Sequence, residues 1–476
     1  ASGSPQDDVR VDVWKTAFNF SDYLEGDIYT AVYTESDAAY AIDEVFGGGN
    51  QANYAPAGGE NSTKRTKVFV HNCLNTIRRV FSGGNAAAAV GVVNTIQGGR
   101  MDYIFGGGNG EVSAANIGSG GTNLVVMGGT INSLFGGSNN SGDIAGQMYT
   151  EVNNESGCAE YIAEFYGGCN LAPLTTDNGV YSIIKCGAGT IAEAYGGSKL
   201  ADIVGNVTFD VRGGEIENVF GGSKGREGTT DDDAADIDGN VTLNLEGGNI
   251  TNAFGGSNIN GNITGNITVN VIDFEGTCGL DLTNVYGCGN LTPYNPSGNA
   301  KPVVNVMHIA REEGIRGNVF GGAYGASATV TSNPIVNIGY VDAMSGYLPD
   351  DLPEDLSTED FVALVSGNVY GGGELAPVAG STEINVNNGT VVHKVVGGGK
   401  QANITANTEV YIKGGNIGTD SDAVTGLGKG VYGGCDQEGN VGGYSLVELT
   451  GGTVGVSDDN TANVHGGGYG SATTVT

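Results

Sequence analysis

Basic residues are scarce in this chain of 476 residues. It contains 20 lysines and arginines against 53 aspartates and glutamates, which gives a formal net charge of −33. A field of this sign repels phosphate backbones and anionic membrane surfaces, so we expect no nucleic acid among the partners. The same surplus of acid favours cations, basic proteins or simple solubility.

Long hydrophobic runs are missing as well. No apolar stretch reaches the 18 or so residues that a membrane-spanning helix needs. We therefore expect no membrane insertion in this segment. The chain starts at Ala1 without an initiator methionine, as a processed or recombinant product would. A secreted or cell-surface protein is the resulting expectation.

Proline is rare, with 10 residues, and the 86 glycines follow no collagen Gly-X-Y period. Because 39% of the residues are apolar, the composition is not that of a disordered chain. Valine, isoleucine and threonine are plentiful, which favours many short strands joined by turns.

What the chain does contain is one short motif, repeated 14 times at intervals of 24 to 50 residues. The motif, called the box below, is an apolar residue, an aromatic residue and two glycines, with Ser82 and Cys288 each replacing one glycine. Val396 and His465 occupy the aromatic place in two copies. The twelve aromatic members are Phe46, Phe81, Phe105, Phe135, Tyr166, Tyr195, Phe220, Phe254, Tyr286, Phe320, Tyr370 and Tyr432.

The repeated unit predicts the fold. Residues 239–258, GNVTLNLEGGNITNAFGGSN, show two alternating segments that each stop at glycine, which is the pattern of short strands ended by turns. A propeller blade needs roughly 40 to 50 residues, more than the shortest interval provides. An array of hairpins would require Asn-Gly turns between facing strands. We therefore predict an all-β fold, a right-handed parallel β-helix (solenoid) of about fourteen coils.

Coil stacking assigns a role to each part of the box. The twelve aromatic rings should lie above one another as a ring stack in the core. The glycines should supply positive φ angles at a corner where any Cβ would also clash with the next coil. Asparagine, which tolerates a left-handed corner and can bond the asparagine above it, stands four residues after the aromatic place in seven boxes. These are Asn50, Asn85, Asn109, Asn139, Asn170, Asn258 and Asn290.

The boxes VFGGGN, VYGGGE and VFGGSN, each after a T-x-x-V-x-G-G strand, resemble the glycine-rich repeats of large adhesin-like surface proteins of anaerobic bacteria. The coil pattern is similar to that of the right-handed pectate-lyase-like β-helix superfamily. The resemblance covers residues 41 to 476 and implies the fold more specifically than the function. That superfamily includes polysaccharide lyases and hydrolases, phage tailspikes and non-catalytic adhesins.

The ends and insertions define the domain organisation. Residues 1–40 lack the box, and we predict that they form an N-terminal cap over the open edge of the β-helix of residues 41–476. Insertions occupy residues 225–240, 291–302 and 345–367. In the last of these, Ser357 and Asp360 form a capping box that predicts a short helix. Function is expected on these loops or the strand face beside them.

Two groups of residues are candidate sites. In the acidic insertion, Asp231, Asp233, Asp236 and Asp238 could bind calcium, although the EF-hand spacing is absent and a solvated acidic loop is the favoured interpretation. No other cofactor is expected. Cys158 and Cys186 stand at nearly one phase of adjacent coils, eight and nine residues before their box aromatics, so they form either a disulfide or a ladder of buried thiols.

We expect no enzyme, because the acids change phase from coil to coil and no arginine shares a phase with an acid pair. The favoured function is that of a non-catalytic, adhesin-like protein whose rigid, multivalent surface binds a glycan or a surface protein. One alternative is a structural subunit that stacks end to end into a filament or stalk, through self-association of its β-helix ends. The other is a polysaccharide lyase or hydrolase.

Overall fold

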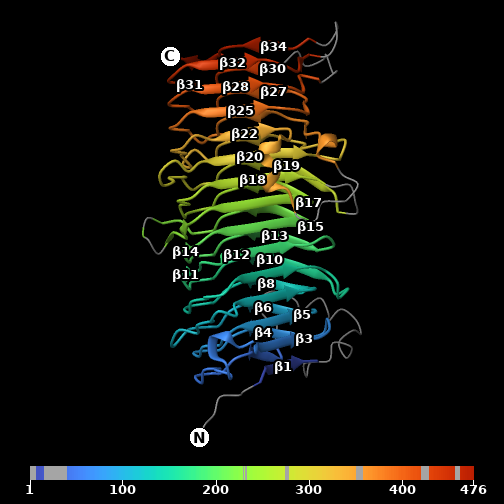
Figure 1. The fold of residues 1–476 in the computed structure, drawn as a ribbon, viewed down its shortest axis with the longest axis vertical. Coiled ribbons are helices and arrows are strands. Elements are labelled where there is room, and N and C mark those ends of the chain that lie inside the picture. Colours follow the sequence, from blue (N-terminus) through green and yellow to red (C-terminus); the bar gives the residue numbers. More distant parts are fainter. Residues whose placement is uncertain are drawn as a thin grey trace, which may run out of the picture. The chain divides into compact units, whose positions relative to one another are not determined.

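The computed structural model of the chain describes residues 7–14, 40–228, 230, 233–273, 278–349, 357–419, 428–455 and 461–476. The chain divides into two compact units, residues 1–206 and 207–476. Each unit is a parallel β-helix, as the repeat predicts (Figure 1). The helices of the described residues are short 3-10 turns, and none of these could cross a membrane.

The N-terminal unit has two long columns of parallel strands. The strands that end in a box form one column: β2 (Ile42–Phe46), β4 (Thr76–Phe81), β6 (Arg100–Phe105), β8 (Gly129–Phe135), β10 (Glu160–Tyr166) and β13 (Thr190–Tyr195). The strands that precede them form the other: β1 (Val9–Val13), β3 (Thr66–Val70), β5 (Val92–Ile96), β7 (Thr122–Val126), β9 (Met148–Val152) and β12 (Val180–Ile184). The short strands β11 (Leu174–Thr175) and β14 (Ile203–Val204) pair on a third side.

The C-terminal unit repeats this plan. Its first two coils join both columns in single bulged strands, β15 (Val207–Phe220) and β17 (Val241–Phe254). The box column continues through β19 (Leu280–Tyr286), β21 (Val319–Phe320), β24 (Val369–Tyr370), β27 (Lys394–Val396), β30 (Gly430–Tyr432) and β34 (Asn463–His465). The preceding column continues through β18 (Ile267–Ile272), β20 (Pro302–His308), β22 (Ile335–Ile338), β25 (Thr382–Val386), β28 (Thr408–Ile412) and β32 (Ser445–Leu449).

Shorter strands complete the coils of the C-terminal unit. Four of them form one parallel column: β23 (Leu364–Val365), β26 (Thr390–Val391), β29 (Asn416–Ile417) and β33 (Thr453–Val454). A further side contains β16 (Ile237–Asp238) and the pair β31 (Glu438–Val441) and β35 (Ala472–Val475). A polypeptide with this many parallel neighbours satisfies its backbone hydrogen bonds between coils rather than within them.

Alternating side chains place the core inside each coil. In β17, Val241, Leu243 and Leu245 are fully buried, whereas Thr242 and Asn244 between them are only partly buried. This is the period-2 pattern of a strand with one face on a hydrophobic core. The same inward positions are valine or isoleucine in β18 and Pro302, Val304 and Val306 in β20, so one apolar column runs along the inside of these coils.

The box glycines are required by close approach between coils and not by a left-handed backbone. A Cβ on Gly255 would lie 2.5 Å from the carbonyl oxygen of Gly287 in the next coil. Neither Gly255 nor Gly256 has a positive φ angle, so that part of the prediction is wrong. Positive φ angles occur instead between the two strands of a coil, as at Gly248, where φ is +95°.

The box aromatics stack in parallel within each unit. Neighbouring ring centroids lie 4.7–5.0 Å apart from Phe46 to Tyr195 and 4.7–4.9 Å apart from Phe220 to Tyr370. Val396 then interrupts the column, and His465 stacks on Tyr432 at 5.1 Å. The spacing follows the distance between hydrogen-bonded strands, so the backbone ladder sets the ring contacts.

The box asparagines form a hydrogen-bonded ladder rather than left-handed corners. In the N-terminal unit, the Nδ2 of each one donates to the Oδ1 of the asparagine one coil earlier, from Asn170 back to Asn50, at 2.8 Å for each bond. Among the described residues other than glycine, only Asn72 has a positive φ angle. Hydrogen bonding between stacked side-chain amides, as in ladders of identical strands, therefore explains why asparagine recurs four residues after the aromatic.

The C-terminal unit has a second ladder with charged ends on its other strand column. Asparagine amides donate one after another along β25, β22, β20, β18 and β17, through Asn385, Asn337, Asn305, Asn270 and Asn244, at 2.9–3.1 Å. The last of these donates to Asp210 at 2.7 Å. At the other end, the Lys413 ammonium donates to Asn385, also at 2.7 Å. All the bonds thus run in one direction, from a cation to an anion.

The predicted cap of residues 1–40 falls largely outside the described residues. Its described part includes β1, which pairs in register with β3 from Val9 opposite Thr66 to Val13 opposite Val70. Residues 9–13 therefore continue the strand column of the coils. The role of the remaining cap residues stays a prediction.

The insertions pack back onto the C-terminal unit where they are described. The helix predicted after Ser357 is only the 3-10 turn Thr358–Asp360, although the Ser357 hydroxyl does accept from the backbone N–H of Glu359. The chain becomes extended at Phe361, which is buried against Met307. This apolar contact ends the turn. In the 291–302 insertion, Tyr294 is buried and donates to the carbonyl oxygen of Gly265 at 2.7 Å.

Candidate functional site

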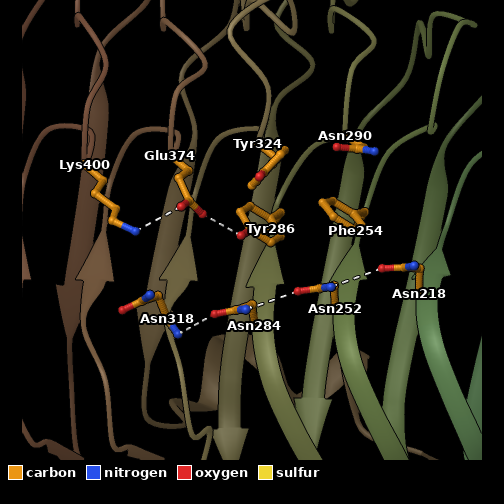
Figure 2. Close-up of a pocket in the computed structure, with 10 residues that line it drawn as sticks. All are labelled: Asn218, Asn252, Phe254, Asn284, Tyr286, Asn290, Asn318, Tyr324, Glu374 and Lys400. Atoms are coloured by element: carbon orange, nitrogen blue, oxygen red, sulfur yellow. Dashed lines mark hydrogen bonds and ion pairs between the residues drawn. The ribbon is translucent and has the colours of Figure 1, made fainter.

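A groove in the C-terminal unit is the best candidate for a binding site, and three columns of side chains build it (Figure 2). The first, called the amide row, stands two residues before the box aromatic. The second is the ring column itself. The third, called the rim column, stands four residues after the aromatic. All three recur once per coil because the box fixes their phase.

The amide row consists of asparagines at the ends of the box strands. Asn252 Nδ2 donates to Asn218 Oδ1, and Asn284 Nδ2 donates to Asn252 Oδ1, both at 3.1 Å. The next rung differs, because the backbone N–H of Asn318 donates to Asn284 Oδ1 at 3.0 Å. Asn368 Nδ2 then donates to Asn318 Oδ1 at 2.9 Å. Figure 2 shows the row from Asn218 to Asn318 along one side of the groove.

Each side-chain amide can donate two hydrogen bonds and accept two. The bonds along the row use one N–H and one acceptor position of Asn252, a residue that is partly exposed. One donor and one acceptor therefore remain at this rung for a ligand. Asn284 retains the same pair, whereas Asn318 Oδ1 accepts two bonds from Asn368 and leaves only its N–H donors for a ligand.

Two stacked rings lie between the amide row and the rim column. Phe254 and Tyr286 are 4% and 3% exposed, and their centroids lie 4.7 Å apart. The Tyr286 hydroxyl donates to Glu374 Oε2 at 2.6 Å. Burial, and then the Glu374 carboxylate, raises the pKa of Tyr286, so the phenol remains a neutral donor.

The rim column contributes Asn290, Tyr324, Glu374 and Lys400 to the groove. The ring of Tyr324 stands edge-on to Tyr286 at 5.7 Å and is 38% exposed, which makes it the most accessible aromatic surface of the groove. Lys400 Nζ donates to Glu374 Oε1 at 2.9 Å. The one cation of the described lining is thus neutralised by the one carboxylate.

The next coils connect the amide row to the rim column directly. Lys394 occupies the amide-row position of the coil in which Val396 replaces a ring, and its Nζ lies 2.5 Å from Asp436 Oδ1. Tyr370 donates to the other oxygen of Asp436 at 2.8 Å. Asp436 is fully buried, and the Lys394 ammonium also lies 4.5 Å from the ring centre of Tyr469.

The size and lining of the groove favour a polar ligand. Its volume is about 430 Å³, within the range of small-ligand sites. Such sites are normally lined by apolar side chains with a few polar groups, whereas amides and the Glu374–Lys400 pair dominate here. A ligand rich in hydroxyl or amide groups could satisfy these side chains, while an apolar ligand would leave them unpaired.

The described aspartates of the acidic insertion each bond to separate groups. Asp233 accepts from Arg226 and Thr230, and these contacts, with the Thr230 hydroxyl first, lower the pKa of Asp233 to about 2. Asp236 accepts from the backbone N–H of Asn262 at 2.7 Å, and Asp238 accepts from the Thr264 hydroxyl at 2.6 Å.

Asp231 lies outside the described residues. Within the described part of the chain, no three histidine, cysteine or acidic side chains come together as a metal site. Calcium binding by this loop therefore stays a prediction.

Both alternatives for Cys158 and Cys186, a disulfide between them or a ladder of buried thiols, are wrong, because each of these cysteines is disulfide-bonded and Cys158 has a different partner. Cys158 pairs with Cys73, with Cα atoms 5.5 Å apart, across two intervening coils. Glycine makes this contact feasible, since a Cβ on Gly98 would lie 2.4 Å from Cys158 Sγ. Cys169, Cys288 and Cys435 are buried free thiols. Burial raises the pKa of Cys169 to about 12 and that of Cys435 to about 11, so both remain protonated.

The sequence analysis missed the groove, although two signals for it are present. Asparagine recurs two residues before the aromatic in five consecutive boxes, from Asn218 to Asn368. In addition, Tyr286 and Tyr370 each bond an acid at the rim position two coils later, Glu374 and Asp436 respectively. In these two places, tyrosine at the ring position coincides with an acid at the rim position.

Comparison with known proteins gives no relative by which the groove could be interpreted. No protein-family model, curated protein or solved structure matches this chain.

Proposed function

We propose that the chain is a non-catalytic, adhesin-like binding protein of the cell surface or the extracellular space, and that its C-terminal unit binds a glycan or a surface protein in the groove. The observation that carries the proposal is the row of amide rungs beside the exposed ring of Tyr324. Stacked coils keep these groups in place, so little ordering cost accompanies binding.

The chemistry of the groove supports binding rather than hydrolysis. Glycoside hydrolysis uses two carboxylic groups, one on each side of the scissile bond. The described lining contains one, Glu374, and this carboxylate is bonded to Lys400 and Tyr286. We expect no product release from polysaccharides incubated with the protein, measured as new reducing ends and as the absorbance of unsaturated uronides.

The cysteines support an extracellular location. Disulfides form and persist mainly in oxidising compartments, and the Cys73–Cys158 bridge closes a loop with a sequence separation of 85 residues. Detection of the linked peptide in protein isolated without reductant would agree with this location.

The test of binding is a screen of the purified protein against immobilised glycans and extracellular proteins. Asn284→Ala and Tyr324→Ala should each weaken the binding of any ligand that the screen finds. Asn337→Ala is the matched control, because it removes an equivalent amide rung from the other strand column of the same unit. Unchanged binding by both groove variants would contradict the assignment of the groove.

A further inference from the structure

Resting on the proposed binding function, the geometry points to a specific class of ligand: a neutral, hydroxyl-rich polysaccharide chain that lies along the amide row with about one sugar unit per coil. Four features of the groove carry this inference: its period, its hydrogen-bonding groups, its charge and its exposed ring.

The period of the groove is that of the coils. The ring centroids of Phe254, Tyr286 and Phe320 lie 4.7 and 4.9 Å apart, and the asparagines two residues before them repeat in the same register. An extended peptide advances about 3.3 Å per residue, so side chains on one face recur only every ~6.6 Å and lose register with the rungs. One hexose in an extended β-linked chain advances by nearly the width of one coil. Each sugar unit can therefore present hydroxyls to one rung, with alternate edges of the ring facing consecutive rungs in a two-fold β-1,4-linked chain.

The hydrogen-bonding groups of the row complement hydroxyls. After pairing along the row, Asn252 retains one N–H donor and one acceptor position on the same amide. A hydroxyl both donates and accepts, so a pair of neighbouring hydroxyls can bond both groups of one rung. Carboxylates or phosphates, which only accept, would leave the amide oxygens unsatisfied.

The charge of the groove excludes acidic chains. Lys400 is paired with Glu374 at 2.9 Å, and the protein as a whole carries a formal net charge of −33. A uronic acid polymer would meet no unpaired cation among the described lining residues and would be repelled by the surrounding field. A neutral chain avoids this repulsion.

The exposed ring provides the apolar part of the site. Tyr324 is 38% exposed and is held edge-on against Tyr286. A pyranose has an apolar face formed by its axial C–H bonds, and tyrosine combines an apolar ring with a polar tip. A sugar packed on Tyr324 would keep its equatorial hydroxyls directed toward the polar sides of the groove.

Chain length gives the sharpest test. We would titrate the whole protein with β-1,4-linked gluco-, manno- and xylo-oligosaccharides of two to six units and measure the affinities by calorimetry. Four asparagines of the amide row, from Asn218 to Asn318, line the groove. Affinity for at least one series should therefore rise roughly 2- to 10-fold per unit, as one net hydrogen bond per rung implies, and level off near four units.

The variants and controls separate this inference from the function on which it rests. Tyr324→Ser and Asn284→Ala should each lower the affinity for the tetrasaccharide at least roughly 5-fold, while Asn337→Ala leaves it unchanged. Because Tyr324 is a surface side chain, its loss should not unfold the protein, and a thermal melt of each variant checks this. Raising sodium chloride to a high concentration should leave the affinity unchanged, because no net charge is paired on binding.

Three results would overturn the inference. The first is preferential binding of polygalacturonate that is lost in salt, and the second is an affinity that does not change beyond two sugar units. The third is binding of a surface protein through the groove with no binding of any neutral oligosaccharide, in which case the proposed function survives and the ligand class does not. Binding of neither class in the initial screen would instead refute the proposed function itself.

Discussion

Replacement of Asp436 by alanine should loosen the C-terminal unit next to the groove. Asp436 is fully buried and bonds the Lys394 ammonium at 2.5 Å and the Tyr370 hydroxyl at 2.8 Å. The Lys394 side chain is only 12% exposed, so without the carboxylate its charge has no anionic partner in a site that water barely reaches. The phenol of Tyr370 loses its acceptor in the same substitution.

The expected cost follows from the buried ion pair. Removal of one partner of such a pair costs about 3–5 kcal/mol, because the other charge stays behind uncompensated. At about 1.4 kcal/mol for each factor of ten, local opening should become ~10²- to 10⁴-fold more frequent. A triple variant, Tyr370→Phe, Lys394→Met and Asp436→Leu, removes all the polar groups together and should lie much closer to the wild type.

The assay should be local, because each coil of a solenoid is stabilised mainly by its neighbours and unfolding of the whole chain is not two-state. Hydrogen–deuterium exchange of peptides covering β27 and β30 reports the opening directly. Asp281→Ala is the control, since its bond to Arg316 at 2.8 Å is half exposed and should contribute no more than about 1 kcal/mol. Unchanged protection in Asp436→Ala, or equal damage in the single and triple variants, would refute the reasoning.

Three further predictions concern stability. Loss of the Cys73–Cys158 disulfide in a double serine variant should lower stability by about 4.5 kcal/mol, the chain-entropy value for a loop of 85 residues, and an unchanged melting temperature without reductant would contradict this. Burial raises the pKa of Glu160 from 4.5 to about 7, so the wild type should lose stability as pH rises between these values. Glu160→Gln should remove that loss and be more stable by up to about 3 kcal/mol at pH 8 but not at pH 4, which melts at both pH values can check. Phe320→Ala empties a fully buried position between two stacked rings and should cost about 3–5 kcal/mol of local stability, measured by hydrogen–deuterium exchange of peptides covering β21; a cost below about 1 kcal/mol would show that the ring contacts contribute little.

The coil architecture could be predicted because the box marks the same phase in every coil. Once Phe254 and Tyr286 are assigned to equivalent positions, the strands that end with them must lie side by side. The reason given for the glycines was only half correct, since close approach at Gly255 leaves no sign in the sequence that distinguishes it from the positive φ at Gly248. Both positions are simply glycine, and only the backbone conformation separates the two causes.

The disulfide partner required information on how the turns between strands are routed. Cys73, like Cys158, stands eight residues before its box aromatic, so the phase signal was available. The prediction assumed that partners must lie in adjacent coils. Glycines one residue later in the intervening coils, Gly98 and Gly128, leave room for the two cysteine loops to meet. Loop routing of this kind depends on contacts far apart in the sequence.

The groove was hidden for a related reason. Periodicity identifies columns of equivalent residues, but it does not show how far a side chain reaches across to another column. Tyr286 bonds Glu374 two coils away, and Tyr324 of the coil between them stands against the same ring. Such contacts depend on side-chain length and on the depth of the corner, which the sequence pattern does not encode.

The ladder from Lys413 to Asp210 has a consequence for how the C-terminal unit could change in length. Every internal asparagine offers a donor to one neighbour and an acceptor to the other, so a duplicated coil inserted between β17 and β25 would find both partners already in place. Duplication of an end coil would instead place a charged side chain inside the row. Its neighbour on one side could still form the hydrogen bond, but its neighbour on the other side could not. The ladder therefore tolerates additional coils between its two ends but not beyond them.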